Sequence, residues 1–361
     1  MNSLHPILAN ILSLADPHTW ESSAALADRA LADWAKTPRS FTRVYLVGHG
    51  SSLYNGQVGE SVLEHIAGLP SKAIPGFSFS AYTEETILDA HTLVVGISTT
   101  GETQSVCDAL ERARRAGAFT FAITAYEGSA ITRAAEAVIL SGGVDDQMSV
   151  KTKSYVQALI PLYLLAVKLN GDPQQKRRWS DQLKRAAEGA HRFLSEGRDQ
   201  IKQLAELYGE APKVFVLGTG PNLGTAEEAS LKIIEMAKMY SECQELEDFM
   251  HGRLREVDHN SPLFFVAPKG NASRRILDFL TVTDMIHAPS IVLTDEVTPG
   301  IQRLATHVIP MPAALDEFAT PLLYILPMHL FAYEMALQRG YDPDARRYNI
   351  IPQNIRYQGE E

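Results

Sequence analysis

The sequence predicts an α/β protein built from two tandem, doubly wound parallel-sheet domains, each a three-layer αβα arrangement. Three observations support this prediction. A chain of 361 residues is too long for one ordinary core and suits two domains. Apolar runs of strand type recur at a constant offset of 170 residues. Segments of helical length separate these runs, and such strand–helix alternation produces a parallel sheet covered on both faces.

The repeat is read directly from matching segments. VYLVGHG (44–50) and VFVLGTG (214–220) both end in GxG, and 214 − 44 = 170. Three further pairs keep this offset, namely LVVGI (93–97) and LFFVA (263–267), FAIT (121–124) and IVLT (291–294), and AVIL (137–140) and HVIP (307–310). A fixed period indicates a duplicated structural unit. We therefore expect a first domain at 40–173 and a second at 210–343.

The segments outside the two copies are predicted to be helical or to form a tail. An N-terminal helical segment (1–39) precedes the first copy, a charged connecting helix (174–209) joins the copies, and a short tail (344–361) follows. Inside the copies, the longest helical patterns cover 102–118 and 223–240. The sequence thus predicts two similar lobes with a helical connector.

Composition narrows the possible partners. The formal net charge is −10 and the nearest approach to a basic run is KRR at 176–178, which argues against a nucleic-acid partner. The first residues lack the cationic start of a signal peptide, and the longest apolar stretch (155–169) is short for a membrane span. Two cysteines in unrelated contexts indicate neither a disulfide framework nor a thiolate metal site. We expect a reduced cytoplasmic protein that is not bound to a membrane.

Two loops of the first copy are rich in glycine and hydroxyl groups. They are GHGSS (48–52) and STTGET (98–103), and each follows an apolar strand. Ligands of doubly wound domains bind at the carboxyl ends of the strands, and a helix that starts there offers free N–H groups to an anion. The alternative is that the hydroxyls only cap helices. Four hydroxyls in six positions exceed that need, so we predict a site for a phosphate monoester.

The second copy lacks these two hydroxyl-rich loops. APKGNAS (267–273) stands where the first copy has ISTTGET, and GTGPN (218–222) answers GHGSS. One phosphate site per chain is therefore expected. Dinucleotide binding is disfavoured, because Leu53 replaces the third glycine of GxGxxG and no GxxxxGK[ST] is present.

One acidic residue interrupts the apolar run IIEMAKMY (233–240). Glu235 would be a strong base if its apolar neighbours formed its pocket, whereas an ordinary helix glutamate simply faces water. Lys232 lies one turn earlier on the same face, where it could hold a sugar hydroxyl or pair with the acid. His251, followed by Gly252, could exchange a proton near neutral pH or merely form a turn. Glu242 is a weaker candidate on the same face as Glu235.

The two hydroxyl loops, the later SVKTKSY (149–155) and the tandem duplication resemble the sugar isomerase (SIS) domain family. The resemblance covers nearly the whole chain. It is strongest to the isomerase half of glucosamine-6-phosphate synthase, to glucosamine-6-phosphate deaminase and to fructosamine-6-phosphate deglycases. It implies flavodoxin-like domains, a sugar-phosphate substrate, no metal or organic cofactor, and a homodimer or higher homo-oligomer with sites near the subunit contacts.

The resemblance also implies roles for particular residues. Glu235 falls on the catalytic carboxylate and His251 on the ring-opening histidine, with the family separation 251 − 235 = 16, and Lys232 matches the leading lysine of K-x-x-E. The phosphate residues carried over are Ser51, Ser52, Ser98, Thr99, Thr100, Gly101 and Thr103. Weaker substrate contacts are implied for Gly50, Ser149, Val150, Lys151, Arg346 and Arg347.

One departure from the pattern favours a particular reaction. The synthase and deaminase carry a Schiff-base lysine in the C-terminal tail, whereas residues 342–361 contain none. The ARRY segment (345–348) instead resembles the deglycases. A substrate that already carries an amine at C1 can form its own imine, so we expect a deglycase or deaminase of an amino-sugar or ketosamine 6-phosphate. The alternatives are a ketose/aldose phosphosugar isomerase, a non-catalytic phosphosugar-binding regulator and a structural role.

Overall fold

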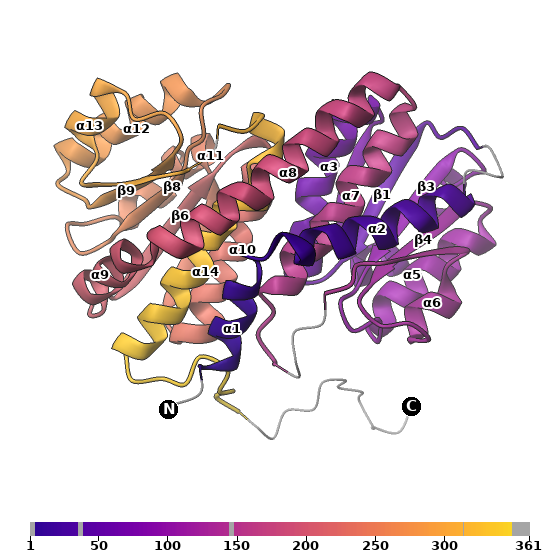
Figure 1. Ribbon diagram of the computed structural model, residues 1–361, viewed down its shortest axis with the longest axis horizontal. Helices are drawn as coiled ribbons and strands as arrows, with labels where there is room; N and C mark the ends of the chain where they lie inside the picture. The colour runs from indigo at the N-terminus through magenta and orange to yellow at the C-terminus, as the bar shows by residue number, and fades with distance from the viewer. Residues whose placement is uncertain (1–3, 35–38, 144–147, 313, 349–361) are drawn as a thin grey trace.

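The computed structural model describes residues 4–34, 39–143, 148–312 and 314–348. The chain forms two lobes, each built around a five-stranded parallel sheet (Figure 1). The first sheet has strand order β2-β1-β3-β4-β5 and the second β7-β6-β8-β9-β10, which are the same order. The strands are β1 (Arg43–Gly48), β2 (Ser71–Pro75), β3 (Thr92–Ile97), β4 (Phe119–Thr124), β5 (Ala137–Leu140), β6 (Lys213–Gly218), β7 (Tyr240–Glu245), β8 (Leu263–Val266), β9 (Ser290–Thr294) and β10 (His307–Pro310).

The structure keeps the repeat that the sequence predicts. The first strands of the two sheets begin at Arg43 and Lys213, and 213 − 43 = 170. The last strands begin at Ala137 and His307, and 307 − 137 = 170. The strand order is that of doubly wound, flavodoxin-like sheets. The predicted fold class, two tandem αβα domains with a parallel sheet in each, is confirmed.

Helices cover both faces of each sheet. In β3, Leu93 and Val95 pack into the core shared with α3 and α7, whereas Val94 packs on the opposite face with α5. This alternation follows from the period of two along a strand. The helices are α1 (Pro6–Ser13), α2 (Pro17–Trp34), α3 (Ser51–Ala67), α4 (Gly76–Tyr82), α5 (Gln104–Arg115), α6 (Ala130–Ala134), α7 (Lys153–Asn170), α8 (Pro173–Glu196), α9 (Arg198–Tyr208), α10 (Leu223–Ala237), α11 (Leu246–Met250), α12 (Ser273–Met285), α13 (Pro299–Leu304) and α14 (Pro321–Gln338).

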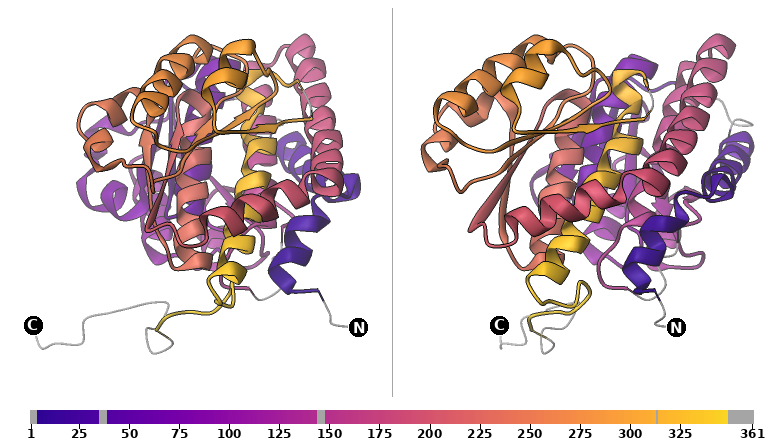
Figure 2. Two further views of the ribbon diagram at one scale, coloured as in Figure 1. Left: turned by 90° about the vertical axis from the view of Figure 1, so that its left-hand side faces the viewer. Right: turned by 60° about the vertical axis from the view of Figure 1, so that its left-hand side comes forward.

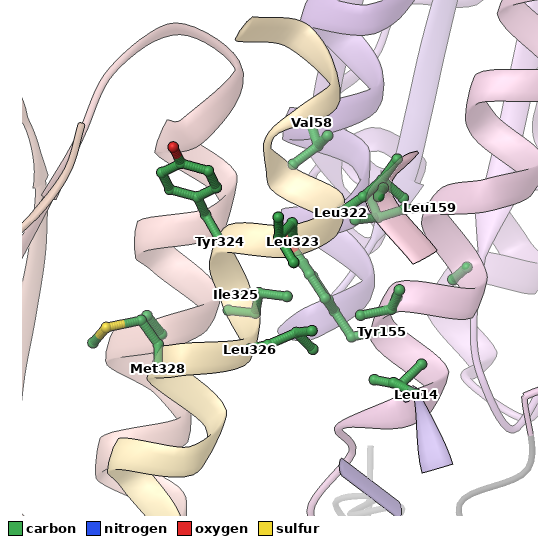
Figure 3. Packing of buried hydrophobic residues seen from close by; sticks show 14 of the residues in the cluster. Leu14, Val58, Tyr155, Leu159, Leu322, Leu323, Tyr324, Ile325, Leu326 and Met328 are labelled. Carbon is green, nitrogen blue, oxygen red and sulfur yellow. The ribbon is translucent and has the colours of Figure 1, made fainter. Parts of the chain in front are cut away.

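One continuous apolar core joins the two lobes. Helices α3 and α7 of the first lobe and α10 and α14 of the second lie between the sheets (Figure 1). Helix α14 is apolar on all sides and is buried from Pro321 to Ala336, as expected of a helix with no solvent face. Figure 3 shows Leu322, Leu323 and Leu326 of α14 close to Tyr155 and Leu159 of α7. This shared core fixes the two lobes against each other.

The connector is two helices rather than the single helix expected for 174–209. Helix α8 ends at Glu196, and α9 begins at Arg198 after the cap residue Gly197. A Cβ at Gly197 would lie 2.7 Å from the Phe193 ring, so the chain turns where a side chain would not fit. Helix α8 packs on both α7 and α14, and it is seen beside both lobes in Figure 2. Among the described residues, no helix is both long and apolar enough to cross a bilayer.

The crossing of α3 and α10 determines which loops meet which side chains. Gly224, near the start of α10, lies so close to α3 that a Cβ there would be 2.6 Å from the Tyr54 carbonyl oxygen. At the other end of α10, Lys232 contacts Ser51, the first residue of α3. The two helices therefore run antiparallel, and the C-terminal end of α10 lies over the carboxyl edge of the first sheet.

Candidate functional site

The first predicted loop connects β1 to α3. Gly50 has φ 52° and precedes the helix that starts at Ser51. A Cβ at Gly48 would lie 2.7 Å from the Ser52 carbonyl group, so glycine is needed for this tight return. The side chain of Ser51 contacts the second lobe, whereas Ser52 is buried in the first lobe. Of the two serines, only Ser51 is thus shown to face the junction of the lobes.

The second predicted loop connects β3 to α5. Gly101 has φ 71°, and a Cβ there would lie 2.0 Å from the Ser129 hydroxyl oxygen. Thr103 is the N-cap residue of α5, yet its hydroxyl makes no capping bond. Instead the Thr103 hydroxyl lies 3.0 Å from the Ser98 hydroxyl, which accepts the Gly101 N–H at 3.1 Å. The hydroxyls are therefore grouped with one another, and helix capping does not explain them.

The tip of this loop adds two more hydroxyl-bearing residues, Thr99 and Thr100. The Thr100 hydroxyl accepts the Glu102 N–H at 3.4 Å, and the Thr99 carbonyl accepts the Ala125 N–H at 3.1 Å. Both loops lie where the chain leaves neighbouring strands β1 and β3 in opposite directions, the position at which ligands bind doubly wound sheets. Hydroxyl donors beside a helix N-terminus suit a phosphate dianion.

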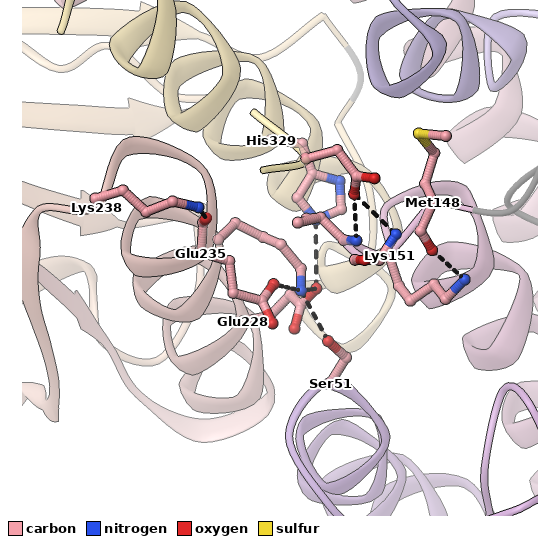
Figure 4. A network of polar contacts seen from close by, with 11 residues as sticks. Ser51, Met148, Lys151, Glu228, Glu235, Lys238 and His329 are labelled. Carbon is pink, nitrogen blue, oxygen red and sulfur yellow. Dashed lines mark hydrogen bonds and ion pairs between the residues drawn. The ribbon is translucent and has the colours of Figure 1, made fainter. Parts of the chain in front are cut away.

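Lys232 connects the first of these loops to the second lobe (Figure 4). Its ammonium lies 2.6 Å from Glu235 Oε2, 3.0 Å from the Ser51 hydroxyl oxygen and 3.3 Å from Glu228 Oε1. Burial alone would lower the pKa of Lys232, but Glu228 and Glu235 outweigh it and the pKa is raised. Only 1% of the side chain is exposed, and the ammonium donates hydrogen bonds to Glu235 and Ser51 and forms an ion pair with Glu228. Lys232 therefore pairs with Glu235, and its contact with a sugar hydroxyl stays a prediction.

The surroundings of Glu235 differ from the apolar pocket that its sequence neighbours suggested. Ile233 and Met236 are buried in the core on other faces of α10. The Glu235 side chain is 34% exposed, and its partner is the Lys232 ammonium. It is a partly exposed carboxylate that Lys232 connects to Ser51 of the first hydroxyl loop.

His251 lies elsewhere on the second lobe. It is the cap residue at the end of α11, its side chain is 73% exposed, and its Nε2 is 3.9 Å from Glu247 Oε1. Helix α10 ends near the start of β7, whereas His251 follows the end of β7. The six residues of β7 span about 20 Å. A single chain therefore does not bring His251 to Glu235.

The weaker candidates meet around the loop that precedes α7. The Ser149 and Val150 N–H groups both donate to Asp344 Oδ1, at 2.8 and 3.0 Å, and Arg346 Nε donates to the Ser149 hydroxyl at 3.0 Å. Lys151 bonds its own loop at the Met148 carbonyl, at 2.6 Å. Figure 4 shows this cluster beside the Lys232 network. Arg347 is exposed, and the rest of the predicted tail, 349–361, lies outside the described residues.

Asp344 was not among the sequence candidates. It is separated from Ser149 by 195 residues, and no pattern in either segment indicates the pairing. The carboxylate accepts hydrogen bonds from two converging N–H groups, and such a pair of donors is suited to binding an anion. Through Asp344, the C-terminal segment therefore packs against the predicted substrate loop at Ser149 and Val150.

His49 is a second residue that the sequence reasoning missed, although it lies within GHGSS. Its Nε2 accepts the Phe77 N–H at 3.3 Å and lies 2.8 Å from the Ser105 hydroxyl oxygen. Accepting from a backbone N–H requires an unprotonated Nε2, so the neutral ring carries its proton on Nδ1. Partial burial lowers the pKa of His49, which favours the same neutral form. The histidine ties the first loop to the starts of α4 and α5.

The second lobe has different side chains at the positions that correspond to the site. The Glu317 carboxylate accepts the Asn271 N–H, at 3.1 Å from Oε2, where the first copy has its hydroxyl loop. The residue equivalent to Glu235 is His65, since 65 + 170 = 235. Its ring stacks on Phe318 with centroids 3.8 Å apart. Side chains of the protein itself thus line the corresponding region, where a cavity of about 340 Å³ remains beside Asn271, Glu317 and Phe318. One phosphate site per chain stays a prediction.

Metal ligation has no candidate in the part of the chain that the structure describes, because no three His, Cys, Asp or Glu side chains are grouped to hold an ion.

Comparison with known proteins gives relatives for the whole arrangement. The glutamine–fructose-6-phosphate aminotransferase (isomerizing) of Methanothermobacter thermautotrophicus is 30% identical over 302 residues, which are 84% of this chain and 50% of that protein. The protein of the same name from Aquifex aeolicus is 28% identical over 314 residues, 86% of this chain and 51% of its own length. The chain spans about half the length of the curated relatives that it matches.

Solved structures share the fold. The C-terminal domain of glucosamine-fructose-6-phosphate aminotransferase from Francisella tularensis has a TM-score of 0.83 at 21% identity, and covers 95% of this chain and 99% of its own. Tagatose-6-phosphate ketose/aldose isomerase from Escherichia coli has a TM-score of 0.78 at 20% identity, with 96% of both chains covered. Glucosamine-6-phosphate deaminase from Thermotoga maritima has a TM-score of 0.73 at 20% identity, with 94% and 96% covered.

The family model of the SIS domain matches the chain twice, at residues 39–168 and 206–339. These two matches coincide with the two sheets and their flanking helices. The chain therefore belongs to the SIS domain family.

Proposed function

We propose that the protein is a phosphosugar-processing enzyme. It binds a 6-phosphorylated ketosamine or amino sugar and moves a proton between C1 and C2, after which the amine is released. The observation that carries the proposal is the Lys232 ammonium, which joins Ser51 of the first hydroxyl loop to the carboxylate of Glu235. A sugar held by its phosphate on the first lobe lies next to this carboxylate.

The chemistry follows from these groups. The hydroxyls of Ser98 and Thr103, with the start of α5, bind the phosphate dianion. Glu235 accepts a proton from C1 of the open-chain ketosamine and returns it to C2. The product is an imine at C1, which water hydrolyses to the aldose phosphate and the free amine. The protein supplies orientation and proton transfer for each of these steps.

The names of the relatives support the substrate class. Those of the Methanothermobacter, Thermotoga and Escherichia proteins each include a hexose 6-phosphate or its amino derivative. The absence of lysine from residues 342–361 favours an amine-bearing substrate over a free ketose. A ketose/aldose isomerase is the second candidate, because the Escherichia isomerase matches this chain over its full two-lobe length.

A substrate panel tests the proposal. Purified protein is incubated with 6-phosphorylated ketosamines, glucosamine 6-phosphate and fructose 6-phosphate, and both released amine and aldose phosphate are measured. Amine release from a ketosamine or glucosamine 6-phosphate supports the proposed reaction. Turnover of fructose 6-phosphate alone selects the isomerase. Tight binding of a sugar phosphate without turnover selects a phosphosugar-binding regulator.

We extend the proposal to a homodimer in which His251 of one chain opens the sugar ring at the site of the other. The supporting observation is that Glu235 and His251 lie at opposite ends of the second sheet in one chain. Subunit complementation tests it. Glu235→Gln and His251→Asn variants should each be inactive, and an exchanged equimolar mixture should recover about a quarter of wild-type activity, since half the dimers carry one intact site. An inactive mixture of demonstrably exchanged subunits contradicts the shared site.

A further inference from the structure

Lys238 ends the helix that carries Glu235, and it does so in an unusual conformation. Its backbone has φ 52° and ψ 30°, in the left-handed region. Among the described residues, His287 is the only other non-glycine residue with positive φ. Glycine adopts this conformation without a clash, whereas a residue with a Cβ is strained. Glycine at position 238 would end α10 with less backbone strain, so the presence of lysine indicates that its side chain has a role.

The side chain folds back over the last turn of α10. Its ammonium donates to the backbone carbonyl oxygen of Glu235, three residues earlier. Figure 4 shows Lys238 and Glu235 together at this end of the helix. A lysine can cap a helix C-terminus in this way. If capping were its whole role, the amine could be removed with no effect on proton transfer at Glu235.

Charged groups from two elements surround the amine. Glu235 lies on its own helix, and Asp342, Asp344 and Arg347 of the C-terminal segment act on the amine electrostatically. Burial of the amine lowers the pKa of Lys238, Arg347 lowers it further, and the three carboxylates oppose the shift without cancelling it. The side chain therefore exchanges protons closer to neutral pH than an exposed lysine does.

The proposed reaction needs a proton donor besides Glu235. When a base removes a proton from C1, negative charge develops on the carbonyl oxygen at C2, and a donor placed there lowers the barrier. Lys232 is buried, and its ammonium already contacts the Ser51 hydroxyl and the carboxylates of Glu228 and Glu235. Lys238 carries an ammonium on the same helix end, and its half-buried side chain is not enclosed in this way.

We propose that Lys238 is a second catalytic residue, which donates a proton to the C2 carbonyl oxygen while Glu235 removes a proton from C1. This inference rests on the proposed function. The C1–H bond breaks, its electron pair forms the C1–C2 double bond, and the carbonyl π pair takes the Lys238 proton. Glu235 then delivers its proton to C2, which leaves an iminium at C1. When water adds to C1, neutral Lys238 takes the proton that the water loses, which gives a carbinolamine. The hydroxyl proton of the carbinolamine then passes to its nitrogen, the C1–N bond breaks, and the aldehyde and the free amine form.

The test separates the side chain from the backbone. Lys238→Gly removes the amine and relieves the strain, so the variant should fold with an unchanged or higher melting temperature. His287→Gly is the matched control, because it makes the same backbone change on an exposed loop at the end of α12. Lys238→Arg keeps the charge and raises the pKa of the donor. For each variant, exchange of the C1 hydrogen with D₂O is followed by NMR across pH, with a 6-phosphorylated ketosamine and with fructose 6-phosphate.

We expect Lys238→Gly to slow C1 exchange by on the order of 10²-fold or more, while His287→Gly exchanges at the wild-type rate. The wild-type rate should fall at alkaline pH as Lys238 loses its proton, and Lys238→Arg should move this limb to higher pH. If the wild type exchanges C1 and a folded Lys238→Gly variant exchanges it at the same rate, the proposed role of Lys238 is wrong. The proposed function would not be affected by that result. If the wild type exchanges C1 of neither sugar, the proposed function fails and this inference fails with it.

Discussion

The ammonium of Lys232 on α10 lies 3.0 Å from the hydroxyl oxygen of Ser51 on α3, although 181 residues separate them in the chain. The same ammonium bonds Glu235, so one buried cation connects a hydroxyl loop of the first lobe to a carboxylate of the second. This contact also links stability to the candidate site, because the cation neutralises the fully buried Glu228.

Lys232→Met should be strongly destabilising. The substitution leaves Glu228 buried with only the His329 ring, 3.6 Å away, as a basic neighbour, and breaking a buried ion pair in this way costs about 3–5 kcal/mol. Equilibrium urea unfolding measures the loss. Adding Glu228→Gln should restore part of it, since the uncompensated charge is removed. Lys202→Met is the control, because the Lys202–Glu206 pair is solvent-exposed and contributes little. Equal effects at positions 202 and 232 would show that the buried network is not stabilising.

Gly101→Ala should disrupt the second hydroxyl loop. The new Cβ would lie 2.0 Å from the Ser129 hydroxyl oxygen, in addition to the strain of φ 71°. We expect about 1–3 kcal/mol of destabilisation beyond the backbone strain, and loss of sugar-phosphate binding. Gly128→Ala is matched, with φ 73° and no atom within 4 Å of its Cβ. Calorimetric titration with fructose 6-phosphate compares the two variants. Unimpaired binding by Gly101→Ala would place the phosphate elsewhere.

Each chain should bind one sugar phosphate. Ser98→Ala combined with Thr103→Val removes the paired hydroxyls and should abolish binding of fructose 6-phosphate. Glu317→Gln changes the corresponding region of the second lobe and should leave both affinity and a stoichiometry of one unchanged. Isothermal titration calorimetry gives both quantities. Two sites per chain in the wild type would refute the assignment of the phosphate to the first lobe alone.

Acidification should weaken the fold partly through His49. Its pKa is lowered in the folded state by burial, so the unfolded chain binds the proton more readily. The contribution of His49 is therefore full above pH 6.5 and declines as the pH falls from 6.5 through the lower folded pKa. Protonation also removes the acceptor for the Phe77 N–H. Urea midpoints between pH 7 and 5 should fall less steeply for His49→Asn than for the wild type. Parallel profiles would show that His49 does not contribute.

The sequence predicts the fold well because the fold rests on local patterns. Strand periodicity and the constant offset predict both sheets, and hydroxyl-rich loops after two strands are the basis of the proposed phosphate site. The K-x-x-E spacing on a helix is sufficient to predict that Lys232 and Glu235 share a face. These features depend on residues close together in the chain.

The remaining features depend on how distant helices cross. The close approach of α10 to α3 at Gly224 determines that Lys232 reaches Ser51. The angle at which these two helices cross is not encoded by any periodicity in the sequence. The Asp344 carboxylate finds the Ser149 and Val150 N–H groups only after α14 has packed into the core. Glu235 was expected in an apolar pocket because its neighbours are apolar. In the fold Ile233, Met236 and Ala237 face the core and Ile234 is exposed, while Lys232 links the acid to Ser51 at the junction of the lobes.

The most direct test of the central claim is exchange of the C1 hydrogen of a bound phosphosugar with solvent deuterium. Glu235→Gln should bind the sugar phosphate with nearly wild-type affinity and lose exchange by on the order of 10²–10⁴-fold, while Glu242→Gln retains it. A Glu235→Gln variant that binds the sugar and exchanges C1 at the wild-type rate would contradict the account.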